Sequence, residues 1–330
     1  MSGWLFLLII IAGNGGAMSS SGLKTQNFEF MTDLNNINKL SESTEPAISY
    51  STCYASFLYV VLFSGGRTSA FLAKYMQEHP HYKNCIFVFM NTGKEREETL
   101  EFADKCDKEF NLNLIYLEAK VNNEKGKGTT YTIVDFETAS RKGEPFEAML
   151  NKYPLPNNMA SNCTRELKQR PIDAYLRDNY KYYNIIKVIG IRADEAHRKS
   201  NNAEIEKIIY PLCDEVKIDR KFIRNWWEQQ SFDLQLKDYE GNCDLCFKKS
   251  LKKRLTIIKE NPESAKWWLE MEQKYSSKEI PRFDLRTNKS IAELVEMAKL
   301  PFRKAEDLHE FSKQQQELFE FETDCFCKSS

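Results

Sequence analysis

The sequence has almost no net charge. Its 47 Lys and Arg residues balance 48 Asp and Glu residues over 330 positions, which leaves a formal charge of −1. No overall field would draw such a protein to nucleic acid or to an anionic membrane, so binding of that kind needs a local patch. The length and an apolar content of 42% allow one large domain or two small ones.

Long hydrophobic runs are also missing. The strongest run, WLFLLIIIA at residues 4–12, is too short to span a bilayer. No Lys or Arg precedes it, although an ordinary export signal begins with positive charge. We therefore expect a cytoplasmic protein with no membrane partner, and an export signal stays open as the alternative. Residues 1–50 are predicted to be a leader and a polar arm outside the core.

From residue 57 onward, short apolar runs alternate with helical patterns. The runs that predict buried strands are residues 57–63, 85–90, 112–119 and 185–191. Strands that are apolar on both faces are typical of a parallel sheet covered by helices on both sides. We therefore predict an α/β protein with a doubly wound parallel sheet over residues 51–215, in which 119–160 form a long insertion. A helical region follows over residues 216–330.

The loop after the first predicted strand reads SGGRTSA at residues 64–70. Two glycines allow a ligand to approach the backbone closely, and the start of the next helix offers free N–H groups to an anion. The Gly-Lys-Ser/Thr ending of a Walker loop and the spacing of a dinucleotide loop are both absent. The pattern predicts a phosphate site, and a capped glycine turn is the alternative. The residues expected to contact the phosphate are Ser64, Gly65, Gly66, Arg67, Thr68 and Ser69.

This loop resembles the PP-loop of the ATP pyrophosphatase and PAPS reductase superfamily, whose members have an adenine nucleotide alpha-hydrolase-like fold. Four further stretches resemble family motifs in the same order, at residues 91–102, 162–172, 189–198 and 241–250. The last resembles a cysteine motif of a bacterial and phage branch of PAPS reductase-like proteins. The resemblance implies a Rossmann-like sheet of five parallel strands. It also implies that ATP, APS or PAPS is cleaved or attacked beside its α-phosphate.

The chain departs from both main subgroups. The pyrophosphatases usually carry Lys-Asp where this chain has Arg67-Thr68, and true PAPS reductases usually lack the double glycine. The use of magnesium is therefore open. By the same resemblance, the residues that end the second strand contact the nucleotide, and their alternative is an ordinary turn. These residues are Asn91, Thr92 and Gly93.

Arginines follow the last predicted strand in the stretch GIRADEAHR. Arginine suits bidentate contact with phosphate, so Arg192 and Arg198 are predicted to stabilise charge on the leaving group. A surface loop of paired charges is the alternative. Lys168 and Arg165, three apart on one predicted helix, are expected to add positive charge to the same pocket.

Cys243 and Cys246 form a C-x-x-C motif, and Cys163 is the best third thiol because it lies in a family motif. Their separation resembles the iron–sulfur branch of the APS reductases, which implies a [4Fe–4S] cluster. A zinc site or redox dithiol and plain buried thiols are the alternatives. The fourth ligand is open, with Cys213 as one candidate.

Two further features each leave two interpretations. The tail residues Cys325 and Cys327 are either a mobile nucleophile or an inert end. Four lysines in the stretch KKSLKKRL are predicted to share one helical arc, where they either touch nucleic-acid phosphates or form a solvated face. These are Lys248, Lys249, Lys252 and Lys253.

The sequence leaves three functional hypotheses. One is ATP-dependent adenylation followed by sulfur transfer, with nucleic acid as a possible acceptor. The second is reduction of APS or PAPS to sulfite, which needs a thiol or an electron-donor protein as partner. The third is a module without catalysis that senses nucleotides or associates with DNA.

Overall fold

The computed structural model describes residues 57–307 apart from residues 125, 182 and 242. These residues belong to one compact unit. The predicted leader and arm, and the tail residues Cys325 and Cys327, lie outside the described residues. No helix in the described ranges is long and apolar enough to cross a membrane.

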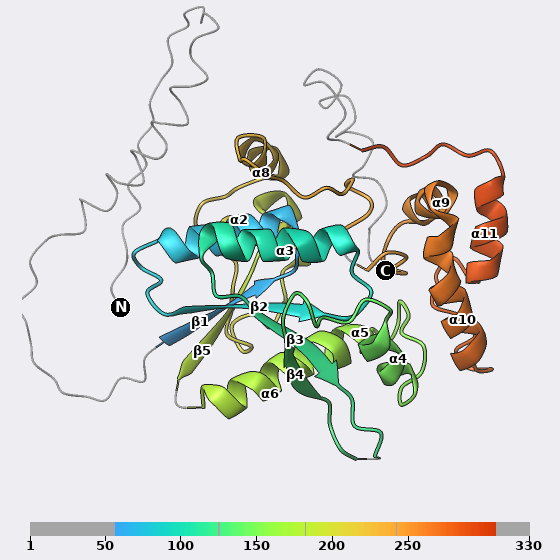
Figure 1. The fold of residues 1–330 in the computed structure, drawn as a ribbon, viewed down its shortest axis with the longest axis horizontal. Helices are drawn as coiled ribbons and strands as arrows, with labels where there is room; N and C mark the ends of the chain where they lie inside the picture. Colours follow the sequence, from blue (N-terminus) through green and yellow to red (C-terminus); the bar gives the residue numbers. More distant parts are fainter. Residues whose placement is uncertain (1–56, 125, 182, 242, 308–330) are drawn as a thin grey trace, which may run out of the picture. The chain divides into compact units, whose positions relative to one another are not determined.

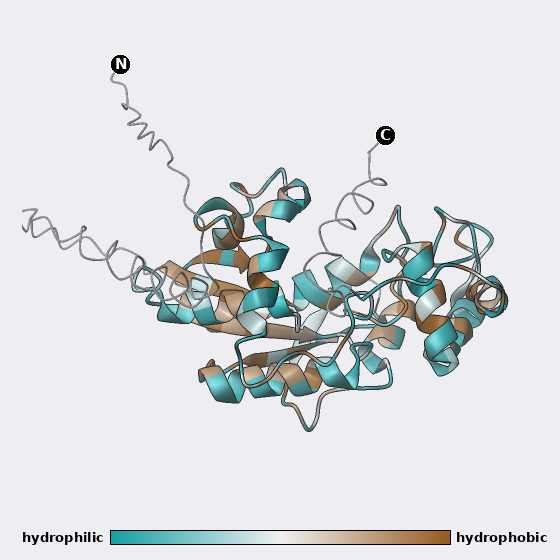
Figure 2. Cartoon of the chain, turned by 90° about the horizontal axis from the view of Figure 1, so that it is seen from above, coloured by the Kyte–Doolittle hydropathy of each residue, from teal (hydrophilic) through white to brown (hydrophobic). Residues whose placement is uncertain are grey.

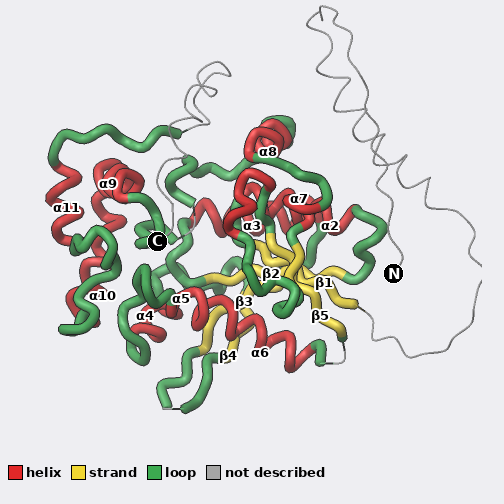
Figure 3. The backbone as a smooth tube through the Cα atoms, turned by 180° about the vertical axis from the view of Figure 1, so that it is seen from behind, coloured by secondary structure: helices red, strands yellow, loops and turns green. Residues whose placement is uncertain are grey.

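The core is a six-stranded sheet in the order β4-β3-β2-β1-β5-β6 (Figures 1 and 3). All neighbouring strands are parallel except β4, which pairs antiparallel with β3. The α/β class is confirmed, and the four predicted strands are found. Their bounds are β1 (Phe57–Phe63), β2 (Cys85–Asn91), β3 (Ile115–Lys120) and β5 (Asn184–Ile189).

The sheet has six strands, not the five that the family resemblance implied. β4 (Thr130–Val134) lies inside the segment that was predicted to be an insertion, and β6 (Ile208–Ile209) has two residues. No residue of β4 is fully buried, and Ile133 is 59% exposed. An edge strand of this kind has no continuous apolar run, so a search for buried parallel strands misses it.

Helices cover both faces of the sheet. Val61 and Phe63 of β1 pack with α2 (Arg67–Glu78) and α3 (Glu97–Phe110) on one face. Leu58 and Val60, which alternate with them, pack against α6 (Arg170–Asn179) on the other face. Figure 2 shows hydrophobic colouring over much of the sheet between these helices. The doubly wound arrangement therefore follows from strands that are apolar on both sides.

The C-terminal part is helical, as predicted. α8 (Arg220–Trp227) packs on α2 through the buried side chain of Trp227. α9 (Leu251–Glu260), α10 (Lys266–Tyr275) and α11 (Ile291–Lys299) form a separate hydrophobic cluster with α4 (Glu144–Leu150). Short elements complete the described chain: α5 (Asn162–Thr164), the π-helix η1 (Arg165–Gln169), the 3₁₀ segments η2 (Ala193–Arg198) and η3 (Pro262–Ala265), and α7 (Pro211–Asp214).

The strand order reverses beside β1. The chain runs outward from β1 through β2 and β3 to β4, and then returns to β5 on the other side of β1. In open α/β sheets, ligands bind outside the carboxyl ends of the strands at such a reversal. The loop after β1 and the segment after β5 both start at this edge.

Candidate functional site

The loop after β1 depends on one glycine. Gly65 has a φ of +76°, and a Cβ added to it would lie 2.4 Å from Cγ2 of Thr99. Both the backbone angle and the close approach of α3 therefore require glycine there. Gly66 differs, since its φ is −107° and the nearest atom to an added Cβ would be the Ser64 hydroxyl at 3.8 Å.

Ser69 closes this loop onto the first turn of α2. Its buried hydroxyl accepts hydrogen bonds from the backbone N–H groups of Ser64 at 3.1 Å and Gly66 at 3.3 Å, and it donates to the Gly66 carbonyl at 2.9 Å. The first turn of the twelve-residue helix α2 carries no acidic side chain. The positive end of the helix dipole thus faces the loop without a competing carboxylate.

Arg67 anchors the start of α2 to the C-terminal region. Its guanidinium pairs with both carboxylate oxygens of Asp233, at 2.7 and 2.8 Å, and donates to the carbonyls of Leu234 and Leu236. The Arg67 carbonyl accepts a hydrogen bond from the Trp227 indole at 3.0 Å. The predicted phosphate contact of Arg67 therefore competes with an ion pair that holds α2 to the C-terminal region.

Arg192 joins the end of β5 to the start of α2. Its side chain is buried, and one of its terminal nitrogens donates to the Thr68 hydroxyl at 3.1 Å. Asp194 accepts two hydrogen bonds from Arg192, both at 2.9 Å. Arg198 is more than half exposed and pairs with Glu195 at 2.6 Å, and Glu195 also lies 3.3 Å from Arg192. The structure thus brings Arg192 to the loop and connects Arg198 to it through a shared carboxylate.

The residues that end β2 are buried structural groups. Asn91 donates to Glu118 at 2.6 Å and to the Ser140 carbonyl at 2.8 Å, and its side-chain oxygen accepts from the Gly93 N–H at 3.0 Å. The hydroxyl of Thr92 contacts both carboxylate oxygens of Glu95 at 2.9 Å. Asn91 and Thr92, at 0% and 1% exposure, shape the turn after β2. Their predicted contact with a nucleotide stays a prediction.

Three predicted cysteines meet around one lysine. Cys163, Cys243 and Cys246 are free thiols, and all three interact electrostatically with the ammonium of Lys168. Burial disfavours the charged form of Lys168, but attraction to Cys243, Glu95 and the other two thiols outweighs it, so the pKa of Lys168 is raised. Arg165, expected beside Lys168, instead pairs with the buried carboxylate of Glu166 at 2.8 Å, a residue outside this cluster.

Cys243 is held against the turn after β2. Its sulfur lies 3.6 Å from the Thr92 hydroxyl and 4.0 Å from a carboxylate oxygen of Glu95. Burial raises the pKa of the Cys243 thiol, Glu95 acts in the same direction, and Lys168 opposes both. The thiol cluster and the loop after β1 therefore occupy the same edge of the parallel sheet, at the ends of neighbouring strands.

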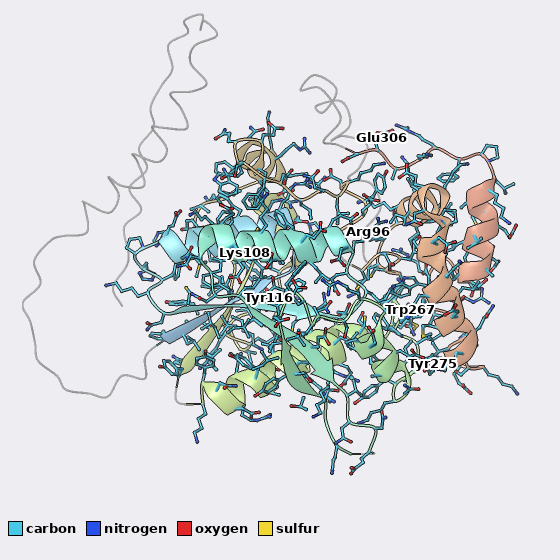
Figure 4. The ribbon with its side chains drawn as sticks, viewed as in Figure 1. Arg96, Lys108, Tyr116, Trp267, Tyr275 and Glu306 are labelled. Atoms are coloured by element: carbon cyan, nitrogen blue, oxygen red, sulfur yellow. The ribbon has the colours of Figure 1, made fainter. Side chains whose placement is uncertain are left out.

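The C-x-x-C turn is fixed by contacts that the sequence did not predict. Asp244 accepts a hydrogen bond from the Trp268 indole at 2.5 Å, and its N–H donates to the Lys94 carbonyl at 3.3 Å. The ammonium of Lys94 lies 4.7 Å from the centre of the Trp267 ring. Figure 4 labels Arg96, the N-cap residue of α3, and Trp267 on α10. Asp244 lies inside a motif that the sequence singled out, but nothing in the sequence predicted its contacts with Lys94 and Trp268.

The helix that carries Cys163 and Lys168 is interrupted by a π-helical segment. The Arg170 N–H donates to the Arg165 carbonyl, five residues back, where a regular helix uses the residue four back. Pro171 follows at once and has no N–H to give to the Leu167 carbonyl. Such π segments are frequent at functional sites, and this one contains Lys168.

The cysteine cluster does not have the arrangement of a metal site. Within the described residues, no group of three or more His, Cys, Asp or Glu side chains is placed to hold a metal ion. The three thiols interact with the ammonium group of Lys168, which would repel a bare cation such as zinc. These residues therefore do not fit a [4Fe–4S] cluster or a zinc ion as they stand, and no chemical step is derived through either.

The predicted lysine arc is also different. α9 begins at Leu251, so Lys248 and Lys249 lie in the turn before the helix. Lys249 faces inward and donates to the carbonyls of Glu240 and Asp244, each at 3.0 Å. The prediction of one helical arc was wrong because it began the helix at Lys248, before the N-cap residue Ser250.

Comparison with known proteins gives one family. Residues 58–218 match the family described as phosphoadenosine phosphosulfate reductase domain. The chain is 38% identical to the uncharacterized nin region protein ORF290 of Escherichia phage lambda over 59% of this chain and 67% of that protein. Among solved structures it is similar to phosphoadenylyl-sulfate reductase from Candida auris, in a phosphate complex. That match has a TM-score of 0.33 and 14% identity, and it covers 65% of this chain and 89% of the other.

An uncharacterized protein of Methanocaldococcus jannaschii, MJ0066, is 22% identical over 46% of this chain, which corresponds to 26% of the archaeal protein. The sheet, its helices and the family match over residues 58–218 define a class, the α/β proteins with the phosphoadenosine phosphosulfate (PAPS) reductase domain. The chain belongs to this family, and its similarity to the phage protein supports a place in the bacterial and phage branch.

Proposed function

We propose that the chain is a PAPS reductase-family enzyme that binds an adenine nucleotide at residues 64–69 and carries out sulfur chemistry with its thiol cluster. The main support for the proposal is that the loop after β1 and the thiol cluster lie at the same edge of the sheet. The loop after β1 leads into the start of α2, whose first turn carries no acidic side chain, and three free thiols interact with Lys168 near the end of β2. Arg192, placed on Thr68, is the group best positioned to stabilise charge on the leaving phosphate.

Reduction of a sulfonucleotide, APS or PAPS, fits this site best. Its sulfur accepts two electrons, and thiols are donors that the site already contains. The second candidate is ATP-dependent adenylation with sulfur transfer to an acceptor such as nucleic acid. The double glycine at residues 65–66 favours it, because that loop resembles the ATP-cleaving members. Release of sulfite or release of AMP and pyrophosphate distinguishes the two.

The binding site is tested by Gly66→Val. The backbone at Gly66 is extended and an added Cβ has room, so this variant should fold. Its branched side chain would stand where the loop receives a phosphate, so we expect calorimetric affinity for ATP, APS and PAPS to fall at least tenfold. Gly128→Val, at an exposed glycine with no atom within 4 Å of an added Cβ, is the matched control.

Unchanged affinity in a folded Gly66→Val protein would show that the phosphate lies elsewhere. Tight nucleotide binding without release of sulfite, AMP or pyrophosphate would favour a nucleotide-sensing module without catalysis.

A further inference from the structure

A pocket of about 450 Å³ lies on the face of the sheet that α6 covers. Its walls come from α6, from the turn between α6 and β5, from β5 itself and from residues 205–207, just before β6. Figure 1 shows α6 and α2 on opposite sides of the sheet, and α2 is the helix that follows the phosphate loop. The pocket is therefore separate from the candidate site, and the proposed function makes no use of it.

Positive charge is in excess on the pocket walls. The cations are Arg177, Lys181, Lys187 and Lys207, and the carboxylates are Asp173 and Glu206. The ammonium of Lys207 donates to the neutral side chain of Asn184 at 2.7 Å. Because the whole chain has a formal charge of only −1, binding of a polyanion needs a local patch, and these walls provide one.

Lys187 interrupts an apolar strand. β5 reads NIIKVI, and strands inside a parallel sheet normally carry apolar residues on both faces. The Lys187 ammonium pairs with Asp173 of α6 at 2.6 Å, and its side chain stays 25% exposed. A lysine at such a position breaks the pattern that stabilises the sheet, and exceptions of this kind are expected at functional sites.

Exposed apolar side chains lie among these charges. Tyr183 is 44% exposed and Ile205 is 83% exposed, and both line the pocket. The Tyr183 ring packs on Tyr180 with ring centres 5.9 Å apart, which restricts its movement. An accessible aromatic ring beside several cations is the combination that binds single-stranded nucleic acid, because bases stack on the ring while phosphates meet the cations.

We propose that this pocket binds a single strand of nucleic acid, with a base against Tyr183 and neighbouring phosphates at Arg177 and Lys207. The cations come from separate segments of the chain, which suits several phosphates in a row better than the phosphate of one nucleotide. Arg177 pairs with Asp178 at 3.2 Å, but both side chains are exposed, so a phosphate can replace that partner. The inference goes beyond the proposed function, which concerns the carboxyl ends of the strands.

Fluorescence anisotropy with the full-length protein and a short labelled single-stranded DNA tests the aromatic contact. Tyr183→Ala should weaken binding by about tenfold, the loss of one stacked base, whereas Tyr183→Phe should keep it. The melting temperature of each variant shows that it is folded. A photoreactive uracil in the strand should cross-link to the peptide that contains Tyr183.

A salt titration of the same complex tests the phosphate contacts. Lys207→Gln and Arg177→Gln should each weaken binding and lower the slope of log affinity against log salt concentration by about 0.7, the value for one phosphate of a single strand. Lys108→Gln is the matched control, because Lys108 is an exposed lysine of α3, on the other face of the sheet. It should leave the affinity and the slope unchanged.

The Gly66→Val protein should bind the strand as tightly as the wild type, because the pocket does not include the phosphate loop. Loss of strand binding in this variant would place the strand on that loop and overturn the inference. Equal affinity for a duplex of the same sequence, or binding that Tyr183→Ala and Lys207→Gln leave unchanged, would also overturn it. If adenine nucleotides bind but no strand does, this inference alone fails, and if a strand binds but no adenine nucleotide does, the proposed function alone fails.

Discussion

At the scale of single residues, the loop after β1 shows that two adjacent glycines serve different purposes. Gly65 is required by the fold, because its φ is positive and Thr99 leaves no room for a Cβ. Gly66 has ordinary extended backbone and free space. The sequence offers both as one phosphate-binding pair, and only the structure separates the residue that builds the loop from the residue that leaves space for a ligand.

We predict that Gly65→Ala lowers the free energy of unfolding by at least about 1–2 kcal/mol, the cost of a left-handed conformation for a residue with a Cβ, and that the contact with Thr99 adds to it. Gly66→Ala should change it little. Urea unfolding of the two variants measures the difference. Adding Thr99→Ala to Gly65→Ala should restore the part of the unfolding free energy that is lost to the steric contact. The part lost to the backbone conformation should remain. Equal stability of the two glycine variants would contradict this account.

Residue chemistry alone did not predict every partner. Arg67 follows the two glycines and was expected at the phosphate; its guanidinium pairs with Asp233, 166 positions along the chain, and its phosphate contact stays a prediction. A partner so distant leaves no local signal. Cys163, Cys243 and Cys246, in contrast, were expected together and interact around Lys168. Motif resemblance predicted this group because it carries long-range information that periodicity lacks.

At the scale of elements, apolar pattern predicted the buried strands and most helices. β1 was predicted at its observed bounds, and α8, α9, α10 and α11 fall within residues 216–330, the region predicted to be helical. The pattern failed at β4, whose residues are half-exposed or exposed at the sheet edge. It also missed the π segment, because a one-residue change of helical register leaves the apolar spacing almost unchanged.

We predict that Pro171→Ala removes this π segment. Alanine would supply an N–H that can donate to the Leu167 carbonyl, and the helix from Asn162 to Asn179 would then approach a regular register. Lys168 would turn relative to the thiols, so turnover should fall several-fold while nucleotide affinity and thermal stability are kept. Steady-state kinetics with calorimetric binding measure the two effects separately.

A matched control is Pro145→Ala, which replaces a proline in the first turn of α4, where the missing N–H breaks no helical bond. If Pro171→Ala kept full turnover, the π segment would have no role in placing Lys168.

At the scale of the whole molecule, the site depends on the junction between the sheet and the C-terminal helices. Gly93, after β2, lies against Gly143 before α4, and a Cβ on Gly143 would be 2.6 Å from the Trp267 ring of α10. Asp244 ties the C-x-x-C turn to Trp268 of the same helix. The thiols are therefore positioned by the C-terminal helical cluster, although the phosphate loop belongs to the sheet.

The C-terminal helical cluster contains one fully buried ion pair. Arg254 of α9 pairs with Asp284, and each side chain is 1% exposed. Asp284 also accepts hydrogen bonds from the Thr287 hydroxyl at 2.7 Å and from the Arg286 N–H at 3.0 Å, which fix the segment before α11. Removing one partner leaves an uncompensated charge in an apolar environment, which costs far more than losing an exposed pair.

We predict that Asp284→Asn lowers the free energy of unfolding by about 3–5 kcal/mol, because the guanidinium of Arg254 stays buried without its counter-charge. Glu263→Gln, which breaks an exposed pair with Lys266, should cost less than about 1 kcal/mol. Urea unfolding followed by tryptophan fluorescence compares the two variants. Because the same cluster holds the C-x-x-C turn through Trp268, Asp284→Asn should also speed alkylation of Cys243, whereas Glu263→Gln should not. Similar effects of the two substitutions on stability would mean that Arg254 finds another partner or solvent when Asp284 is neutral.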